Sequence, residues 1–153
     1  ANLDTEKFAA GALSATATLG ARGLLVGPAF INAASSGNFL ACGPAPFARI
    51  FPRARAVVHH GGIGTSVQAL AAGIPQLVIP RAHDQPDNAA RLVRLGVGAH
   101  LRYGDFSADA AAQKLRTLLA NPATAAACAQ LKARILADDS QPTLCDWAEE
   151  LAR

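Results

Sequence analysis

The sequence predicts an α/β domain with a parallel sheet and helices on both faces. Short apolar or β-branched runs alternate with helical segments along most of the 153 residues, a pattern typical of a doubly wound, Rossmann-like sheet. Glycine or proline separates most of these segments, as expected where one element must end before the next begins. The length suits one hydrophobic core, so residues 1–153 are predicted to form a single domain.

The first third of the chain is expected to begin with a helix that Asp4 and Thr5 cap and Gly20 ends. The elements that follow are a strand at 23–27, a loop at 28–37, a strand at 38–42 and a helical turn at 47–51 that Pro52 ends. A doubly wound sheet opens on a strand, whereas this chain opens on a helix. We therefore expect that a first strand is missing.

The central stretch, AVVHHGGIGTSVQALAAGIPQLVIP, spans residues 56–80. It predicts, in order, a strand at 57–58, a glycine-rich turn, a helix that Thr65 and Ser66 open and Gly73 ends, and a strand at 76–80. The later elements are a helix at 86–95 with Pro86 in its first turn, a strand at 98–102, and helices at 109–119, 121–137 and 142–151.

The glycine-rich turn between strand and helix suits a phosphate group. Backbone N–H groups and the positive end of the helix meet there, and Gly61, Gly62 and Gly64 allow a close approach. His60 stands at the strand end and can donate a hydrogen bond to a phosphate oxygen. A strand-end histidine bonded to backbone is the plainer alternative, but beside these glycines the phosphate interpretation is favoured.

Other polar residues follow the predicted strands, at the sheet edge beyond which parallel α/β sheets bind ligands. Thr65 and Ser66 suit a phosphate or a helix cap. His59 is expected to face away from His60 and to be structural. The adjacent Asp84 and Gln85 offer acceptors and a donor suited to sugar hydroxyls, while Asp84 also suits a cap for the following helix.

Composition excludes several other classes. The net charge of +3 is small and the arginines are scattered along the chain, so a nucleic-acid-binding surface is not indicated. Three cysteines without a CxxC pair predict neither a metal site nor a disulfide framework and fit a reduced, cytoplasmic compartment. No run reaches membrane-spanning length and no signal peptide is visible. The turn also lacks the GxGxxG and GxxxxGK[ST] patterns of nicotinamide and ATP sites.

The stretch HHGGIGTSVQALAAGIPQLVIPRAHDQPDNAARLVRLGVG resembles the nucleotide-sugar signature of GT-B glycosyltransferases. It is most similar to the family-1 branch, which includes bacterial antibiotic, sterol and rhamnolipid glycosyltransferases and plant UDP-sugar transferases. The HDQPDNAARL segment is especially similar to rhamnosyltransferase-type bacterial members. The signature spans about residues 43–98, and the flanking elements resemble the C-terminal, donor-binding domain of that fold.

The resemblance implies specific roles for residues of this chain. His60 and the backbone from Gly61 through Gly62 and Gly64 to Thr65 would hold the diphosphate of the donor. Further donor contacts would come from Pro46 and Phe47 to the nucleobase, Gln68 to the ribose, and Asp84 and Gln85 to the transferred sugar.

Two positions depart from the plant pattern. Gln68 replaces a ribose-binding glutamate, which suits weaker ribose binding or a deoxyribose donor such as a dTDP-sugar. Pro44 stands where the plant signature has a base-stacking tryptophan, so the base must be held differently. These changes leave UDP and dTDP open as the nucleotide.

The resemblance implies a hexosyltransferase that moves a sugar from a nucleoside diphosphate to an acceptor hydroxyl with inversion, without a metal or cofactor. Its catalytic base and acceptor pocket would lie in an N-terminal domain, so these residues alone are expected to bind donor at most. Any peripheral membrane association would come through that other domain. The alternatives are another GT-B enzyme, such as a UDP-GlcNAc transferase or epimerase, and a non-catalytic nucleotide-binding module.

Overall fold

The computed structural model describes residues 3–152 except 32–34, 36 and 139. Its helices are α1 (Leu3–Thr18), α2 (Phe47–Ile50), α3 (Ile63–Ala72), α4 (Gln85–Arg94), α5 (Ala108–Ala120), α6 (Pro122–Leu136) and α7 (Ser140–Leu151). Its strands are β1 (Gly23–Val26), β2 (Phe39–Cys42), β3 (Val57–His59), β4 (Gln76–Val78) and β5 (Gly98–His100). Three 3-10 turns, η1 (Pro28–Phe30), η2 (Phe51–Arg53) and η3 (Tyr103–Asp105), complete the elements.

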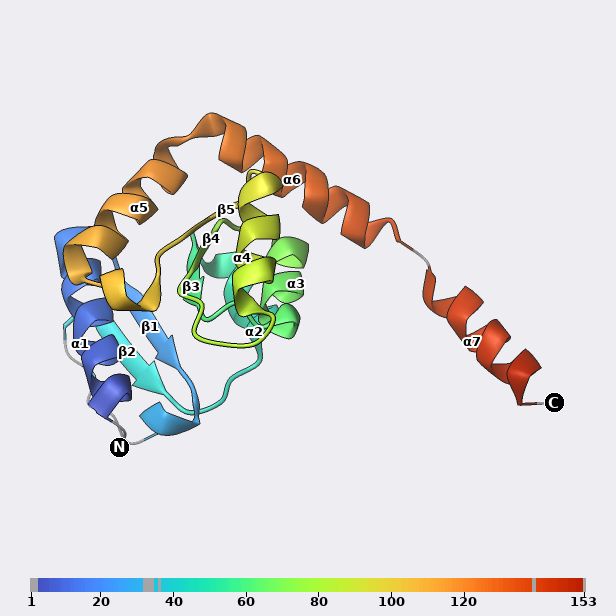
Figure 1. Cartoon of the computed structure of the whole chain (residues 1–153), viewed down its shortest axis with the longest axis horizontal. Helices are drawn as coiled ribbons and strands as arrows, with labels where there is room; N and C mark the ends of the chain where they lie inside the picture. The colour runs from blue at the N-terminus through green and yellow to red at the C-terminus, as the bar shows by residue number, and fades with distance from the viewer. Residues whose placement is uncertain (1–2, 32–34, 36, 139, 153) are drawn as a thin grey trace.

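All strand pairs are parallel, as the sequence predicts, but the described strands form two sheets instead of one. β1 pairs with β2, and the second sheet has the order β3-β4-β5. In Figure 1, β1 lies between β2 and the three-stranded sheet. The spatial order β2, β1, then β3 to β5 matches a doubly wound sheet that lacks the strand at its centre. The expected additional strand remains a prediction, and this order puts its position between β1 and β3.

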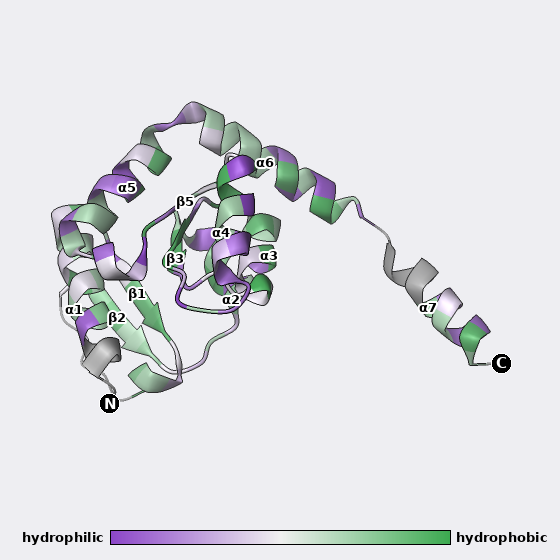
Figure 2. Ribbon diagram, in the orientation of Figure 1, coloured by the Kyte–Doolittle hydropathy of each residue, from purple (hydrophilic) through white to green (hydrophobic). Residues whose placement is uncertain are grey.

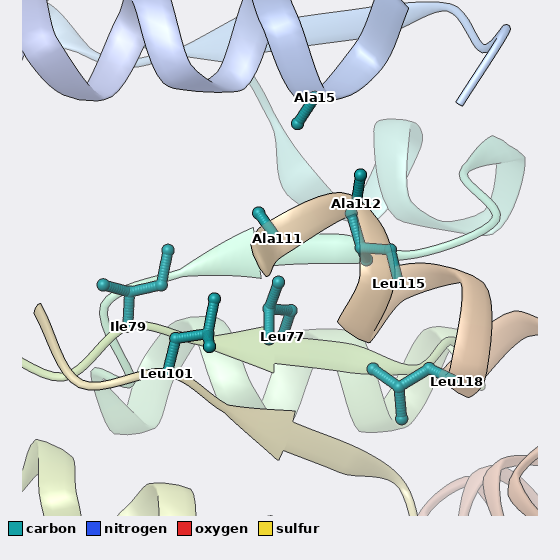
Figure 3. Packing of buried hydrophobic residues seen from close by; sticks show 8 residues of the cluster. All are labelled: Ala15, Leu77, Ile79, Leu101, Ala111, Ala112, Leu115 and Leu118. Carbon is teal, nitrogen blue, oxygen red and sulfur yellow. The ribbon is translucent and has the colours of Figure 1, made fainter. Parts of the chain in front are cut away.

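Helices cover both faces of the β3-β4-β5 sheet. Leu77 and Ile79 pack into a core with residues of α1 and α5, among them Ala15 and Leu115 (Figure 3). Val78 faces the other way and packs against α4 and α6. This alternation follows from the two-residue period of a strand and confirms the predicted layered α/β arrangement.

Most predicted helix ends are correct because glycine adopts the left-handed conformation there. Gly20, Gly73 and Gly96 have φ angles of 59°, 75° and 73° after α1, α3 and α4. Several boundaries are wrong, including the ends of β4 and β5, which were expected at residues 80 and 102. Pro52 lies inside η2 and does not end the helical segment, because proline is compatible with the first positions of a helical turn.

At the N-terminus, α1 already begins at Leu3, so Asp4 and Thr5 lie inside the helix instead of preceding it. The predicted loop at 28–37 contains η1, and its residues 32–34 and 36 lie outside the described part.

The last helix, α7, extends away from the body in Figure 1, and Trp147 on it is 58% exposed. Among the described helices, none combines the length and apolar character needed to cross a membrane.

Candidate functional site

The carboxyl ends of β3 and β4 bring the predicted site residues to one edge of the sheet. β3 ends at His59 and β4 at Val78, so the glycine turn and the loop before α4 leave the sheet on the same side. The side-chain amide of Asn88 on α4 donates a hydrogen bond of 2.9 Å to the carbonyl of Gly61. The turn and the start of α4 are therefore in direct contact.

The turn requires glycine at Gly61 for two reasons. Its φ of 96° lies in the left-handed region. A Cβ there would also come within 2.8 Å of Val78 Cγ1 and 3.2 Å of the Gln85 carbonyl oxygen. The neighbouring Gly62 has an ordinary φ, but a Cβ on it would lie 2.7 Å from His60 Nε2. The exposed His60 ring thus lies across Gly62, at the start of α3.

The helix α3 begins earlier than predicted, at Ile63, with Gly62 as its N-cap residue. Thr65 and Ser66 consequently lie inside the first turn, and neither caps the helix. The hydroxyl of the buried Ser66 donates to the carbonyl of Gly62 at 3.0 Å. No side chain in this described turn caps the helix, so its first N–H groups and the positive end of its dipole are presented to an anion.

His59 is buried, at 8% exposure, and belongs to a hydrogen-bond chain beneath the turn. Its Nδ1 accepts from the Gly61 N–H at 3.1 Å, so the proton is on Nε2, which donates to Gln76 Oε1 at 2.9 Å. Gln76 Nε2 in turn donates to the Ser66 carbonyl at 3.3 Å. The structural role predicted for His59 agrees with these contacts.

The pKa of His59 is lowered to about 4. Burial is the main cause, because it disfavours the charged imidazolium. The hydrogen bond to Gln76 opposes this shift, and the nearby His60 adds to it. His59 is therefore neutral at neutral pH, which its acceptor role toward the Gly61 N–H requires.

The pair Asp84 and Gln85 lies where the sequence predicts, at the start of α4, although the helix begins at Gln85 instead of Pro86. Asp84 precedes the helix but makes no side-chain cap hydrogen bond. Its Oδ2 accepts from Asn88 Nδ2 at 2.8 Å. The Gln85 Oε1 accepts from the backbone N–H groups of Arg81 and Ala82 at 2.8 and 3.2 Å, and these two bonds fix the loop before α4.

The remaining predicted contacts lie around α2 and α3. Pro46 precedes α2, and its carbonyl accepts from the Arg49 N–H at 3.0 Å. Phe47 stacks on Phe51 with ring centroids 4.8 Å apart. Gln68 is exposed on α3, and its NH₂ group donates to the Gly64 carbonyl at 3.3 Å. The donor roles of these three residues remain predictions.

Sequence reasoning missed the supporting contacts of Gln76, Ser66 and Asn88. A polar residue in the otherwise apolar run QLVIP was one available signal for Gln76. The spacing of four residues between Asp84 and Asn88, which puts both on one side of a helix, was another.

Within the described residues, no three His, Cys, Asp or Glu side chains are arranged to hold a metal ion. That donor binding needs no metal or cofactor stays a prediction.

A surface cavity of about 320 Å³ lies away from this site, lined among others by Gly98, Lys114 and Asn121. Gly98 is the first residue of β5, so this cavity is at the amino-terminal edge of the sheet. Parallel α/β sheets bind ligands beyond the carboxyl ends of their strands. We therefore assign the candidate site to the glycine turn and the start of α4.

This fold is that of the C-terminal half of a GT-B glycosyltransferase. The chain belongs to the family of erythromycin biosynthesis protein CIII-like C-terminal domains, whose model matches residues 34–151. Among its relatives, the O-mycaminosyltylonolide 6-deoxyallosyltransferase of Streptomyces fradiae is 36% identical over 118 residues, covering 74% of this chain and 28% of that protein.

Solved structures show the same relationship. The glycotransferase of kitacinnamycin superimposes with a TM-score of 0.83 and 26% identity, covering 94% of this chain and 38% of that one. The spinosyn rhamnosyltransferase SpnG complexed with thymidine diphosphate gives a TM-score of 0.74 and 26% identity, covering 86% and 37%. The chain thus spans only about a quarter to two fifths of the length of these relatives.

Proposed function

We propose that this chain binds the nucleoside diphosphate sugar of a glycosyltransferase that transfers a hexosyl group to an acceptor hydroxyl with inversion. The observation that carries the proposal is the start of α3, where Gly62 provides no side-chain cap and the exposed His60 ring lies across Gly62. These donors suit the charge of a diphosphate.

The proposed donor roles are those that the resemblance implies, and the positions of the residues in the fold support them. His60, Thr65 and the backbone from Gly61 to Gly64 would hold the diphosphate, and Asp84 with the Gln85 NH₂ group would bind hydroxyls of the sugar. Pro46, Phe47 and Gln68 lie around α2 and α3, where base and ribose would extend. A solved relative complexed with thymidine diphosphate, together with Gln68 in place of a glutamate, supports a dTDP-sugar, with a UDP-sugar as the alternative.

In the reaction, the acceptor oxygen attacks the anomeric carbon as the bond from that carbon to the diphosphate breaks. A base outside this chain would take the acceptor proton. The electron pair of the broken bond goes to the diphosphate oxygen, where negative charge develops. His60 and the N–H groups of the first turn of α3 would stabilise that charge, as preorganised donors do at other oxyanion sites.

The test is calorimetric titration of the full-length protein with UDP, dTDP and GDP, comparing wild type with His60→Ala. We expect one nucleotide to bind. In His60→Ala its affinity should fall about tenfold, which is the effect of losing one charge-assisted hydrogen bond. His100→Ala, which removes another exposed histidine at the end of β5, is the control. Absence of binding by every nucleotide, or equal affinity in wild type and His60→Ala, would overturn the proposal.

A further inference from the structure

We propose that Asn88 is a positioning residue of the donor site, which holds the Gly61 peptide so that the start of α3 faces the diphosphate. This inference rests on the proposed function. Asn88 does not itself contact the donor. It connects Asp84, proposed to bind the sugar, with the glycine turn, proposed to bind the diphosphate.

The Asn88 side chain uses both hydrogens of its amide nitrogen. One is donated to the Gly61 carbonyl at 2.9 Å and the other to Asp84 Oδ2 at 2.8 Å. If Asn88 bonded only to Asp84, it would be an ordinary pair four residues apart on a helix surface, with a small effect on α4 alone. The bond to Gly61, 27 residues away in the chain, connects α4 to the glycine turn.

The two peptide groups that flank Gly61 are both fixed by side chains. His59 Nδ1 accepts from the Gly61 N–H, which belongs to the peptide before this residue. Asn88 donates to the Gly61 carbonyl, which belongs to the peptide after it. Because the carbonyl and N–H of a trans peptide point in opposite directions, the Asn88 bond directs the N–H of Gly62, the N-cap residue of α3, away from α4.

The turn needs such restraint because its conformation is unusual. Gly61 has a φ of 96°, and a glycine can leave that conformation more easily than any other residue. The helix that carries Asn88 is itself held by the buried Ala89 and Leu92, at 2% and 3% exposure. Replacing Asn88 is therefore expected to release the turn and leave α4 in place.

The experiment compares dTMP and dTDP as probes of the full-length protein, with UMP and UDP if uridine nucleotides bind instead. The two probes differ by one phosphate, so the ratio of their dissociation constants reports how well the turn holds the diphosphate. We expect Asn88→Ala to raise the dissociation constant of dTDP about tenfold, as for the loss of one restraining hydrogen bond. The dissociation constant of dTMP should stay within about twofold of the wild-type value. A merely structural role would weaken both probes equally.

Two further variants sharpen the test. Asp87→Ala removes the 2.7 Å bond to Arg91 on the same helix and is expected to change the dissociation constant of neither probe. Asp84→Ala should weaken dTDP severalfold, although dTDP has no transferred sugar, because Asp84 orients Asn88. In the variant with both Asp84→Ala and Asn88→Ala, the two effects should not multiply, since they act through one contact.

The outcomes separate this inference from the proposed function. If wild type binds dTDP or UDP and Asn88→Ala keeps the wild-type ratio, or weakens both probes equally, the positioning role is overturned and the donor site stands. If wild type binds none of the nucleotides, the proposed function fails, and this inference fails with it. The inference would be supported if the ratio of the dTMP dissociation constant to the dTDP dissociation constant falls in the Asn88 and Asp84 variants and stays at the wild-type value in the Asp87 variant.

Discussion

The buried His59 gives the candidate site a dependence on pH. The His59 side chain accepts the Gly61 N–H through Nδ1, and protonation of that atom would abolish the contact. The lowered pKa, about 4 against 6.5 for an ordinary histidine, means that the unfolded chain binds the proton more readily than the folded one.

The sign of the effect on stability follows directly. His59 contributes its full stabilisation above pH 6.5, and the contribution is lost as the pH falls from 6.5 toward 4. A shift of this size corresponds to roughly 3 kcal/mol. In His59→Asn, which keeps a side-chain oxygen near the Gly61 N–H but does not titrate there, this part of the pH dependence should be absent.

The measurement is the free energy of unfolding in urea at several pH values from 4 to 7.5. The difference between wild type and His59→Asn isolates the contribution of His59 from the carboxylates that titrate in the same range. Parallel curves for the two proteins would contradict the assignment of a buried, neutral His59.

On the scale of a single element, α3 contains a glycine, Gly64, whose small size is not needed for the packing of the fold. A Cβ on Gly64 would meet no atom within 4 Å, and the residue lies in the first turn of the helix. Alanine is a better helix former than glycine and has less freedom in the unfolded chain. Gly64→Ala should therefore stabilise the protein by about 0.5–1 kcal/mol.

The same substitution should damage the proposed site, because the added methyl group occupies the space through which a phosphate reaches the N–H groups. We expect the affinity for dTDP or UDP to fall at least about tenfold while the midpoint of urea unfolding rises. The gain in stability serves as the control, since it shows that the helix is intact. Unchanged nucleotide affinity would mean that the diphosphate does not approach Gly64.

The element α3 also shows what sequence reasoning could and could not achieve. Its end at Gly73 was predictable because a left-handed glycine is a local signal. Its start was predicted too late, because Ile63 and Gly64 are weak helix formers and resemble a continued turn. The bonds of His59 to Gln76 and of Asn88 to Gly61 span 17 and 27 residues, and no local pattern contains them.

At the scale of the whole molecule, the smaller sheet has an apolar face that the described chain leaves partly uncovered. Leu24 and Leu40 are opposite each other on β1 and β2 and are 46% and 58% exposed. Figure 2 shows both strands coloured as hydrophobic. The alternation of strands and helices was predictable from the sequence, whereas the division into two sheets was not, because strand order depends on contacts between distant segments.

The gap between the two sheets leads to a final prediction. The Val57 N–H donates to the Pro75 carbonyl at 3.1 Å, on the side of β4. Successive backbone groups of a strand point to opposite sides, so the Val58 N–H points toward β1. On β1, the Gly23 N–H bonds to the Asn38 carbonyl at 2.9 Å, on the side of β2, so the Leu24 N–H points toward β3. A parallel strand between β1 and β3 would pair with both.

We expect a longer version of the protein, with a further β-strand joined to its N-terminal side, to place that strand in this gap. Hydrogen exchange followed by NMR should then slow by at least about tenfold at the Val58 and Leu24 amides. The Val57 amide is the internal control, because its bond to Pro75 exists without the added residues. The shorter chain should also self-associate more at high concentration, since unpaired strand edges pair with other chains. Equal exchange at Val58 in the two proteins would show that the gap is not a strand position.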